Sequence, residues 1–340
     1  MLKHKLNPII KILISLFIFV MIVLIAVRCY FRLPVSDYYR ASEKSFVIPG
    51  TNDGFVAQGI EYDSEHQFFI VTGYMKDGSA SPVYLVKPDG RSAEKTVLLA
   101  KSDGLPYSGH AGGIALYNGR IYVADGADIG LYVYDYQSIL GADDNESVSA
   151  LGFLPTSASD GSFIKPSFVS VYNDKLFVGE FYRDIDYPTP EQHKITTSAG
   201  DYQQALGALY VFDEDCDLGL NNMAPECIYT LPDQAQGICF DNGRIYVSTS
   251  WGISKSHILV YDESSIQRQD DIDLLGSTLP LYSLDSAALI CDKEIAPMSE
   301  EIVILDGKMY VMCESASNKY IFGKFTSAKW CYATDISFFE

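Results

Sequence analysis

The stretch Gly112–Val123 has the sequence GGIALYNGRIYV, which is an apolar run, a two-residue turn and a second, alternating run. A similar sequence motif recurs four more times in the 340-residue chain, beginning at Gln58, Ser167, Gln236 and Glu300. Four of the five turns consist of Asn-Gly, Asn-Asp or Asp-Gly, at 118–119, 173–174, 242–243 and 306–307. Because these dipeptides tolerate a positive φ, they close tight β-hairpins. The repeated unit is therefore a hairpin.

Each hairpin is followed by a third strand rich in aromatic and β-branched residues. These third strands begin at Val83, Leu131, Leu209, Ile258 and Trp330. The first strands of successive units begin 54 to 69 residues apart. A period of this size, with several short antiparallel strands in each unit, is typical of a β-propeller. We therefore expect an all-β fold, a β-propeller with one blade per unit and thus five blades.

A fourth, outer strand is expected in most blades. The candidate segments are 95–99, 149–154 and 226–231 in the first three blades, and either 281–284 or 287–290 in the fourth. The fifth blade reaches the end of the chain after its third strand. We expect Phe46–Ile48 to supply its outer strand, which closes the ring and removes exposed strand edges. Six blades are the alternative, if the long region 236–340 hides a degenerate unit.

The N-terminal region differs in composition from the repeats. Ile9–Val27 is apolar except for Lys11 and Ser15, and its 19 residues are enough to cross a hydrocarbon core of about 30 Å as a helix. A cleaved signal peptide is the alternative, but the bulky residues after Arg28 do not form a small-residue cleavage site. Ala26-Val27-Arg28, which precedes Cys29, is a poor context for lipidation, which disfavours a lipoprotein.

The distribution of Lys and Arg around the apolar run modestly favours a cytoplasmic N-terminus. We therefore expect a cytoplasmic segment at 1–8, a signal-anchor helix at 9–27, a linker at 28–45 and an extracytoplasmic propeller at 46–340. The predicted location is the cell membrane, with a single span and the large domain outside the cytoplasm.

The propeller region is strongly acidic. Residues 45–340 contain 18 basic and 42 acidic side chains, a net charge near −24. Such a field repels nucleic acid and anionic lipid surfaces, so nucleic-acid binding is excluded. The acidity either keeps an exported protein soluble or attracts cations.

Candidate ligand-binding residues lie where first strands begin and second strands end, because these points share one rim of a propeller. The candidates at this channel mouth are Gln58, His110, Tyr182, Arg183, His193, Gln236 and Trp251. The segment 183–204 is a long insertion at the same rim and is expected to act as a lid. Structural or solvent-exposed roles are the alternative for the histidines, and packing is the alternative for Trp251.

Acidic residues at the same rim suggest a cation. Asp125, Glu180, Glu300 and Glu314 are expected to form an oxygen-rich ring suited to calcium, with water as the alternative occupant. A second acidic stretch, at 213–219, has the Asp-x-Asp-x-Asp spacing of a calcium loop but lacks its Gly and Glu positions, so an acidic turn is favoured. Cys216 and Cys227 flank the connection between the third and fourth strands that carries this stretch, and they are a candidate disulfide outside the cytoplasm.

The phrases QGIEY at Gln58, QGICF at Gln236 and GHAGGIAL at Gly109 resemble the propellers of the gluconolactonase, strictosidine-synthase and paraoxonase group. The resemblance covers 46–340. It implies calcium held at the channel mouth by carboxylate and Asn side chains near the inner strands, and a lactone or ester hydrolase activity. The matching positions here are Gln58, Ser167, Gln236 and Glu300, and only Glu300 matches in residue type.

Two functions from different classes follow. The first is a non-catalytic, membrane-anchored binding propeller that presents its mouth to a small molecule, a glycan or an extracellular protein. The second is a calcium-dependent lactone or ester hydrolase in which Glu180, Glu300 and Glu314 hold the ion and His110 acts as general base. The sequence lacks serine-hydrolase, zinc-protease and P-loop signatures, and we favour the first function.

Overall fold

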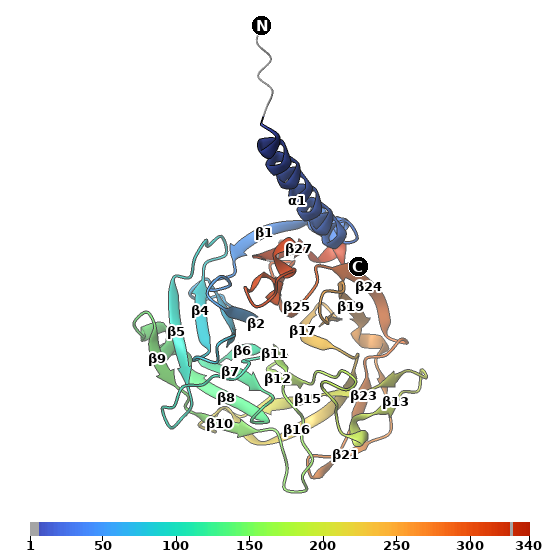
Figure 1. Ribbon diagram of the computed structural model, residues 1–340. Coiled ribbons are helices and arrows are strands. Elements are labelled where there is room, and N and C mark those ends of the chain that lie inside the picture. The colour runs from blue at the N-terminus through green and yellow to red at the C-terminus, as the bar shows by residue number, and fades with distance from the viewer. Residues whose placement is uncertain (1–6, 327–328) are drawn as a thin grey trace.

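The computed structural model describes residues 7–326 and 329–340. Antiparallel sheets stand in a circle around a common axis, and each sheet is one blade (Figure 1). The predicted five-bladed propeller is confirmed. The first strand of each blade is innermost and contacts the first strands of both neighbouring blades, so the ring is closed. These inner strands are β2 (Phe55–Asp63), β6 (Ile114–Tyr117), β11 (Phe168–Tyr172), β17 (Ala235–Asp241) and β25 (Ser299–Leu305).

The remaining strands of each blade follow outward in chain order, with one exception at the outer edge. The second strands are β3 (Phe68–Met75), β7 (Arg120–Asp125), β12 (Lys175–Gly179), β18 (Arg244–Thr249) and β26 (Lys308–Cys313). The third strands are β4 (Pro82–Val86), β8 (Gly130–Asp135), β15 (Ala205–Phe212), β19 (Ser256–Asp262) and β27 (Trp330–Asp335). The fourth strands are β5 (Lys95–Ala100), β10 (Gly152–Pro155), β16 (Leu220–Leu231), β24 (Leu289–Ile295) and, from the N-terminal side, β1 (Ser42–Val47).

Shorter elements supplement the four main strands of the blades. A parallel strand, β9 (Glu146–Ser149), extends the first blade, and β23 (Leu281–Ser283) with β20 (Gln267–Arg268) extends the third. The remaining elements are the hairpins β13 (Ile195–Thr196) with β14 (Tyr202–Gln203) and β21 (Ile272–Leu274) with β22 (Ser277–Leu279), the helix α3 (Tyr136–Gly141) and the short 3-10 helices η1 (Glu191–His193), η2 (Glu263–Ser265), η3 (Glu314–Ala316), η4 (Gly323–Phe325) and η5 (Ile336–Phe338).

The hairpin turns have the geometry that their sequences predict. Asn118 and Gly119 have φ values of 45° and 72°, and Asn242 and Gly243 have 46° and 74°. A positive φ at both central residues is the requirement of the tightest hairpin turn. These turns fix the register of the inner pair of strands and thereby place the opposite ends of those strands at the channel mouth.

Glycines in the repeated hairpin motif allow the inner strands to approach one another around the axis. A Cβ atom on Gly113 would lie 2.6 Å from the Cα of Phe168 on the next blade. A Cβ atom on Gly237 would lie 2.6 Å from the Cα of Glu301. Real Cβ atoms do not approach backbone this closely, so a side chain at either position would push two blades apart.

The ring is closed by pairing the two ends of the propeller. Strand β1 is antiparallel to β27, with Ser42 opposite Thr334 and Val47 opposite Trp330. The predicted closure is confirmed, but the strand begins at Ser42 and not at Phe46. A short helix, α2 (Ser36–Ala41), leads directly into it and buries Tyr38 in the core. In the fourth blade the outer strand is β24, while 281–283 joins the third blade.

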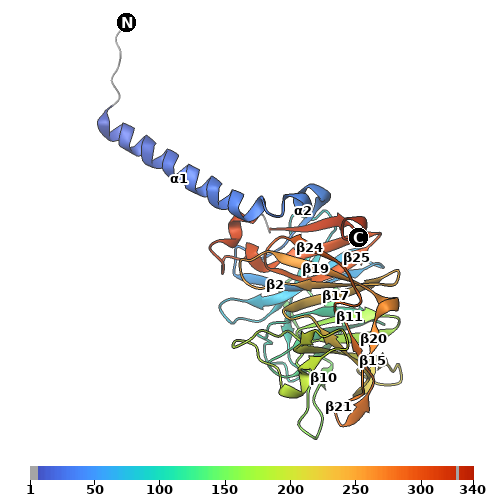
Figure 2. The same ribbon diagram turned by 90° about the vertical axis from the view of Figure 1, so that its right-hand side faces the viewer.

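One long helix precedes the propeller. Helix α1 (Pro8–Arg32) has 25 residues and continues five residues past the predicted span. It has a mean hydropathy of 3.1 over its most apolar window, none of which is buried, so it is long and apolar enough to cross a membrane. Figure 2 shows it projecting away from the disc of blades. Most of the predicted cytoplasmic segment 1–8 lies outside the described residues.

Candidate functional site at the channel mouth

Three inner strands carry a β-bulge at their mouth end. The strand pairing skips one residue between Ala57 and Gly59, one between Ala235 and Gly237, and one within 299–302. The extra residues are Gln58, Gln236 and one of the pair Glu300 and Glu301. A bulge turns a side chain away from the regular pleat, and here it occurs where the sequence predicted ligand-binding residues.

A pair of glutamates dominates the fifth-blade side of the mouth. Gln58 donates from Nε2 to Oε2 of Glu314 at 3.2 Å, and the hydroxyl of Tyr320 donates to the same oxygen at 2.9 Å. Burial raises the pKa of Glu314 to about 7. Burial, and then repulsion from Glu314, raises the pKa of Glu300 well above its usual range.

An aromatic stack with a cation lies beside these glutamates. The rings of Tyr74 and His110 are parallel within 8°, with 4.4 Å between their centroids. Lys319 donates to the Tyr74 hydroxyl, and its Nζ lies 4.7 Å from the Tyr74 ring centroid and 5.2 Å from that of Tyr320. Partial desolvation, and then the positive charge of Lys319, lowers the pKa of His110, which favours the neutral imidazole at pH 7.

We refer to these residues together as the mouth cluster. Its members are Gln58, Tyr74, His110, Glu300, Glu314, Lys319 and Tyr320. They come from the first, second and fifth blades and are brought together by ring closure. Four of them are predicted site residues. Lys319 and Tyr320 were not predicted. They lie in the long connection from β26 to β27, and its length could have indicated a functional loop, as the length of the insertion 183–204 did.

Glu180 and His193 form a separate, fully buried pair. His193 Nδ1 lies 2.8 Å from Oε2 of Glu180, and neither side chain is exposed. The two carboxylate oxygens also accept the backbone N–H groups of Lys165 at 2.9 Å and Leu206 at 3.1 Å. The predicted roles of Glu180 as a metal ligand at the mouth and of His193 on an open lid therefore need correction. The carboxylate anchors the insertion to the third blade.

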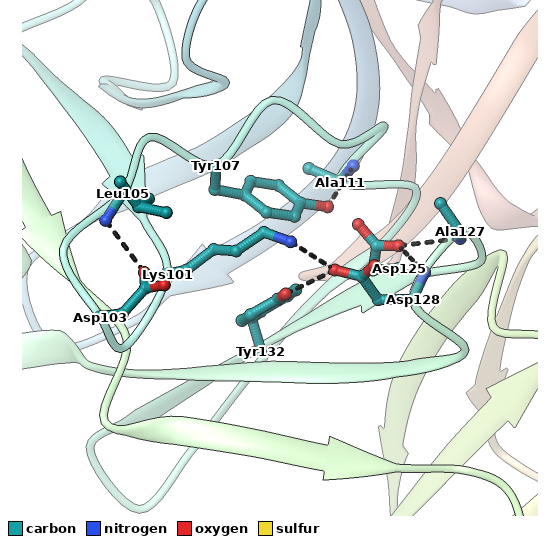
Figure 3. Close-up of polar contacts among 9 residues, drawn as sticks. All are labelled: Lys101, Asp103, Leu105, Tyr107, Ala111, Asp125, Ala127, Asp128 and Tyr132. Atoms are coloured by element: carbon teal, nitrogen blue, oxygen red, sulfur yellow. Dashed lines mark hydrogen bonds and ion pairs between the residues drawn. The ribbon is translucent and has the colours of Figure 1, made fainter.

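Asp125 holds a turn on the second blade. Its Oδ1 accepts the backbone N–H groups of Ala127 at 2.8 Å and Asp128 at 2.7 Å, as the dashed lines in Figure 3 show. Beside it, Asp128 pairs with Lys101 at 2.7 Å. Since Asp125 is only 2% exposed and is committed to this turn, its predicted role as a metal ligand is replaced by a structural one.

Of the other predicted ligand-binding residues, some lie at the rim and one is buried in the core. Arg183 lies over the Trp251 ring, with 4.0 Å from its Cζ to the ring centroid, and the Tyr187 ring meets Trp251 edge-on at 5.8 Å. Tyr182 is buried in the core between the third and fourth blades, which corrects its predicted place in the mouth. Gln236 donates from Nε2 to the Ser250 hydroxyl on its own blade at 3.4 Å.

The predicted calcium ring is not assembled. In residues 7–326 and 329–340, no three His, Cys, Asp or Glu side chains are grouped so that they would hold a metal ion. Glu300 and Glu314 are neighbours, but Glu180 and Asp125 are used elsewhere. Calcium needs six to eight oxygen ligands, so this donor set does not fit the ion, and we derive no chemistry through it.

The predicted disulfide is not formed. Cys216 and Cys227 both carry free thiols, as do the other cysteines that the structure describes. Cys216 lies in the β15–β16 turn beyond the pair Phe212 and Leu220, whereas Cys227 lies opposite Leu209, several residues further along the ladder. The separation along the strands keeps the two sulfur atoms apart.

Glu301 lies deeper than the mouth and connects three blades. Its carboxylate oxygens accept backbone N–H groups of Ile60 at 2.8 Å, Ile114 at 3.0 Å and Val169 at 3.3 Å, which belong to the inner strands β2, β6 and β11. It is 2% exposed, and burial raises its pKa well above the usual range. The channel is therefore crossed by hydrogen bonds below the mouth cluster.

No known protein-family profile and no curated protein matches this sequence. Solved structures do match. They include PQQ-bound aldose sugar dehydrogenase from Streptomyces coelicolor, at 11% identity and a TM-score of 0.46 over 84% of this chain and 95% of that one. Glutaminyl cyclase from Myxococcus xanthus matches at 10% identity and a TM-score of 0.42 over 86% and 97%.

An exo-β-1,3-galactanase from Phanerochaete chrysosporium matches at 11% identity and a TM-score of 0.46, over 86% of this chain and 63% of that one. Likenesses this distant carry no argument about the site. The five-bladed assignment rests on the sheet topology of the chain itself, and the resemblance to the gluconolactonase group stays a prediction.

Proposed function

We propose that this chain is a membrane-anchored, extracytoplasmic propeller that binds an uncharged, hydroxyl-rich ligand, such as a glycan, at the mouth cluster. The observation that carries the proposal is the stack of Tyr74 on His110, next to Lys319 and the glutamate pair. Helix α1 supports the anchor through its length and hydropathy.

The side chains of the mouth cluster match the chemistry of a sugar. Sugars present apolar C–H faces together with many hydroxyl groups that both donate and accept hydrogen bonds. The rings of His110 and Tyr320 supply flat apolar surface, and the buried Tyr74 ring supports the imidazole from beneath, while Gln58 and Glu314 supply donors and acceptors. His110 and Lys319 are exposed, and Gln58, Glu314 and Tyr320 are partly exposed, so a ligand has access to them.

Charge argues against an anionic ligand. The single positive charge of Lys319 lies beside two glutamates whose pKa values are raised, so near neutral pH the cluster carries little net charge. An anion would meet the acidic field of the whole domain. An uncharged ligand avoids that repulsion.

Binding of neutral oligosaccharides to the full chain in lipid nanodiscs tests this function. Tyr74→Ala is expected to weaken binding by about tenfold or more, because it removes the ring on which His110 stacks and the hydroxyl to which Lys319 donates. Tyr117→Ala is the matched control. Tyr117 stacks on Phe212 at 3.8 Å between centroids at the opposite rim, and its loss is expected to leave binding unchanged. Absence of oligosaccharide binding, or equal losses in both variants, would contradict the proposal.

A further inference from the structure

The last turns of helix α1 share an apolar pocket with the mouth rim of the propeller. The pocket is lined by Ala26, Val27, Tyr30, Phe31, Ile253 and Phe322. Ile253 lies in the connection from β18 to β19, and Phe322 lies in the connection from β26 to β27. Both connections belong to the rim that carries Trp251 and Lys319. The end of the helix and the channel mouth are therefore on the same side of the propeller.

The position of this pocket along α1 determines how close the mouth rim lies to the membrane. Val27 is the last residue of the apolar run that begins at Ile9. When α1 spans a bilayer, Val27 lies at the boundary between hydrocarbon and headgroups. Because Ile253 and Phe322 line the same pocket as Val27, they lie at about the same level. The mouth rim is then at the membrane surface and not far out in solvent.

The rim beside this pocket is rich in exposed apolar side chains. We define the rim patch as Ile185, Tyr187, Ile253, Ile321 and Phe322, whose exposed fractions are 86%, 40%, 53%, 80% and 53%. They come from the mouth-side connections of the third, fourth and fifth blades.

Trp251 connects the third-blade and fourth-blade parts of the rim patch, since its ring meets Tyr187 and it is two residues from Ile253. Adjacent exposed apolar groups of this kind mark an interaction surface.

The chemistry around the rim patch fits lipid headgroups. Arg183 stacks on Trp251, and the exposed Lys319 and Lys324 flank Phe322. Aromatic side chains combined with Arg and Lys are typical of the membrane interface. The C-terminal end of α1 contacts η4 in the β26–β27 connection, which is red in Figure 2. In that edge-on view, α1 projects away from the disc of blades from this point.

We propose that the propeller docks with its rim patch in the headgroup layer of the membrane that α1 spans, so that the mouth cluster opens toward the lipid surface. The partner is a bilayer with zwitterionic headgroups, because the strongly acidic domain is repelled by anionic lipid. This inference rests on the membrane anchor of the proposed function and does not depend on the identity of the ligand.

Photocrosslinking of the full chain in phosphatidylcholine nanodiscs tests the docking. Benzoylphenylalanine replaces Ile253 or Phe322 in two variants and Val211 in a third, the control. Val211 is 51% exposed and lies on β15 opposite Lys175, at the far rim. Several-fold more phospholipid adduct is expected at positions 253 and 322 than at 211.

Two results would overturn the inference in distinguishable ways. Equal phospholipid adducts at positions 322 and 211, in a chain that resists alkaline carbonate extraction, would overturn the docking and leave the anchor intact. Extraction of the chain by carbonate would overturn the anchor and the docking together. Neither result depends on whether the mouth cluster binds an oligosaccharide.

Discussion

Individual carboxylates in this propeller have different roles because they differ in what surrounds them. Glu301 accepts backbone hydrogen bonds from three blades, and Glu180 accepts two backbone N–H groups and pairs with His193. The Glu314 carboxylate, by contrast, accepts hydrogen bonds from the side chains of Gln58 and Tyr320. A carboxylate held by backbone is part of the fold, whereas one held by side chains remains available to a ligand.

Glu61 makes the stability of the fold depend on pH. Burial raises its pKa to about 7, although the backbone N–H groups of Tyr62 and Leu116 oppose the shift. The unfolded chain releases this proton at lower pH than the folded chain, so the free energy of unfolding falls as pH rises from about 4.5 to about 7 and then levels off. Glu61→Gln does not titrate and is expected to be more stable than the wild type at pH 8, by up to about 3 kcal/mol, with the difference vanishing near pH 4.5.

Melting temperatures of the full chain at pH 4.5 and pH 8 check this dependence. Glu65→Gln, an exposed position on the same hairpin, is the control and is expected to melt like the wild type at both pH values. A wild type that is at least as stable as Glu61→Gln at pH 8 would show that Glu61 is well solvated or paired.

Most individual strands and turns of the fold could be predicted from the sequence. The turn dipeptides and the alternating runs are local signals, so the hairpins and the third strands were predicted close to their observed places. Strand β1 was predicted too short, because its first residues, Ser42–Lys44, have no apolar pattern and are held by the register with β27. The bulge at Gln58 and the pairing of Glu180 with His193 depend on contacts between distant segments, which sequence spacing does not encode.

Removal of β1 tests its role as the strand that closes the ring. A chain that begins at Leu33 keeps α2 and β1, whereas one that begins at Pro49 loses both and exposes the edge of β27. Tyr38 and Phe46 are buried, and each contributes roughly 2 kcal/mol through burial alone. The shorter chain is expected to melt well below the longer one and to aggregate through the open edge. Equal melting temperatures and a monomeric shorter chain would indicate that the ring holds without this strand.

On the scale of the whole molecule, ring closure has two consequences. It gathers residues from the first, second and fifth blades into the mouth cluster, and it places the end of α1 on the same rim. Gln58, His110, Glu300 and Glu314, which the sequence predicted at the channel mouth, lie together in this cluster, and their role as a site stays a prediction. The sequence did not identify Lys319, because the position of that side chain is set by a long connection without periodic pattern.

The most direct test of the account is hydrogen–deuterium exchange of the full chain in nanodiscs, with and without a saturating neutral oligosaccharide. Slower exchange is predicted in three segments that are distant in sequence, 56–59, 107–114 and 314–320, because ligand binding at the mouth cluster stabilises all three together. Unchanged exchange in these segments, or protection confined to 242–244 and 262–264 at the opposite rim, would contradict a ligand site assembled by the five-bladed ring.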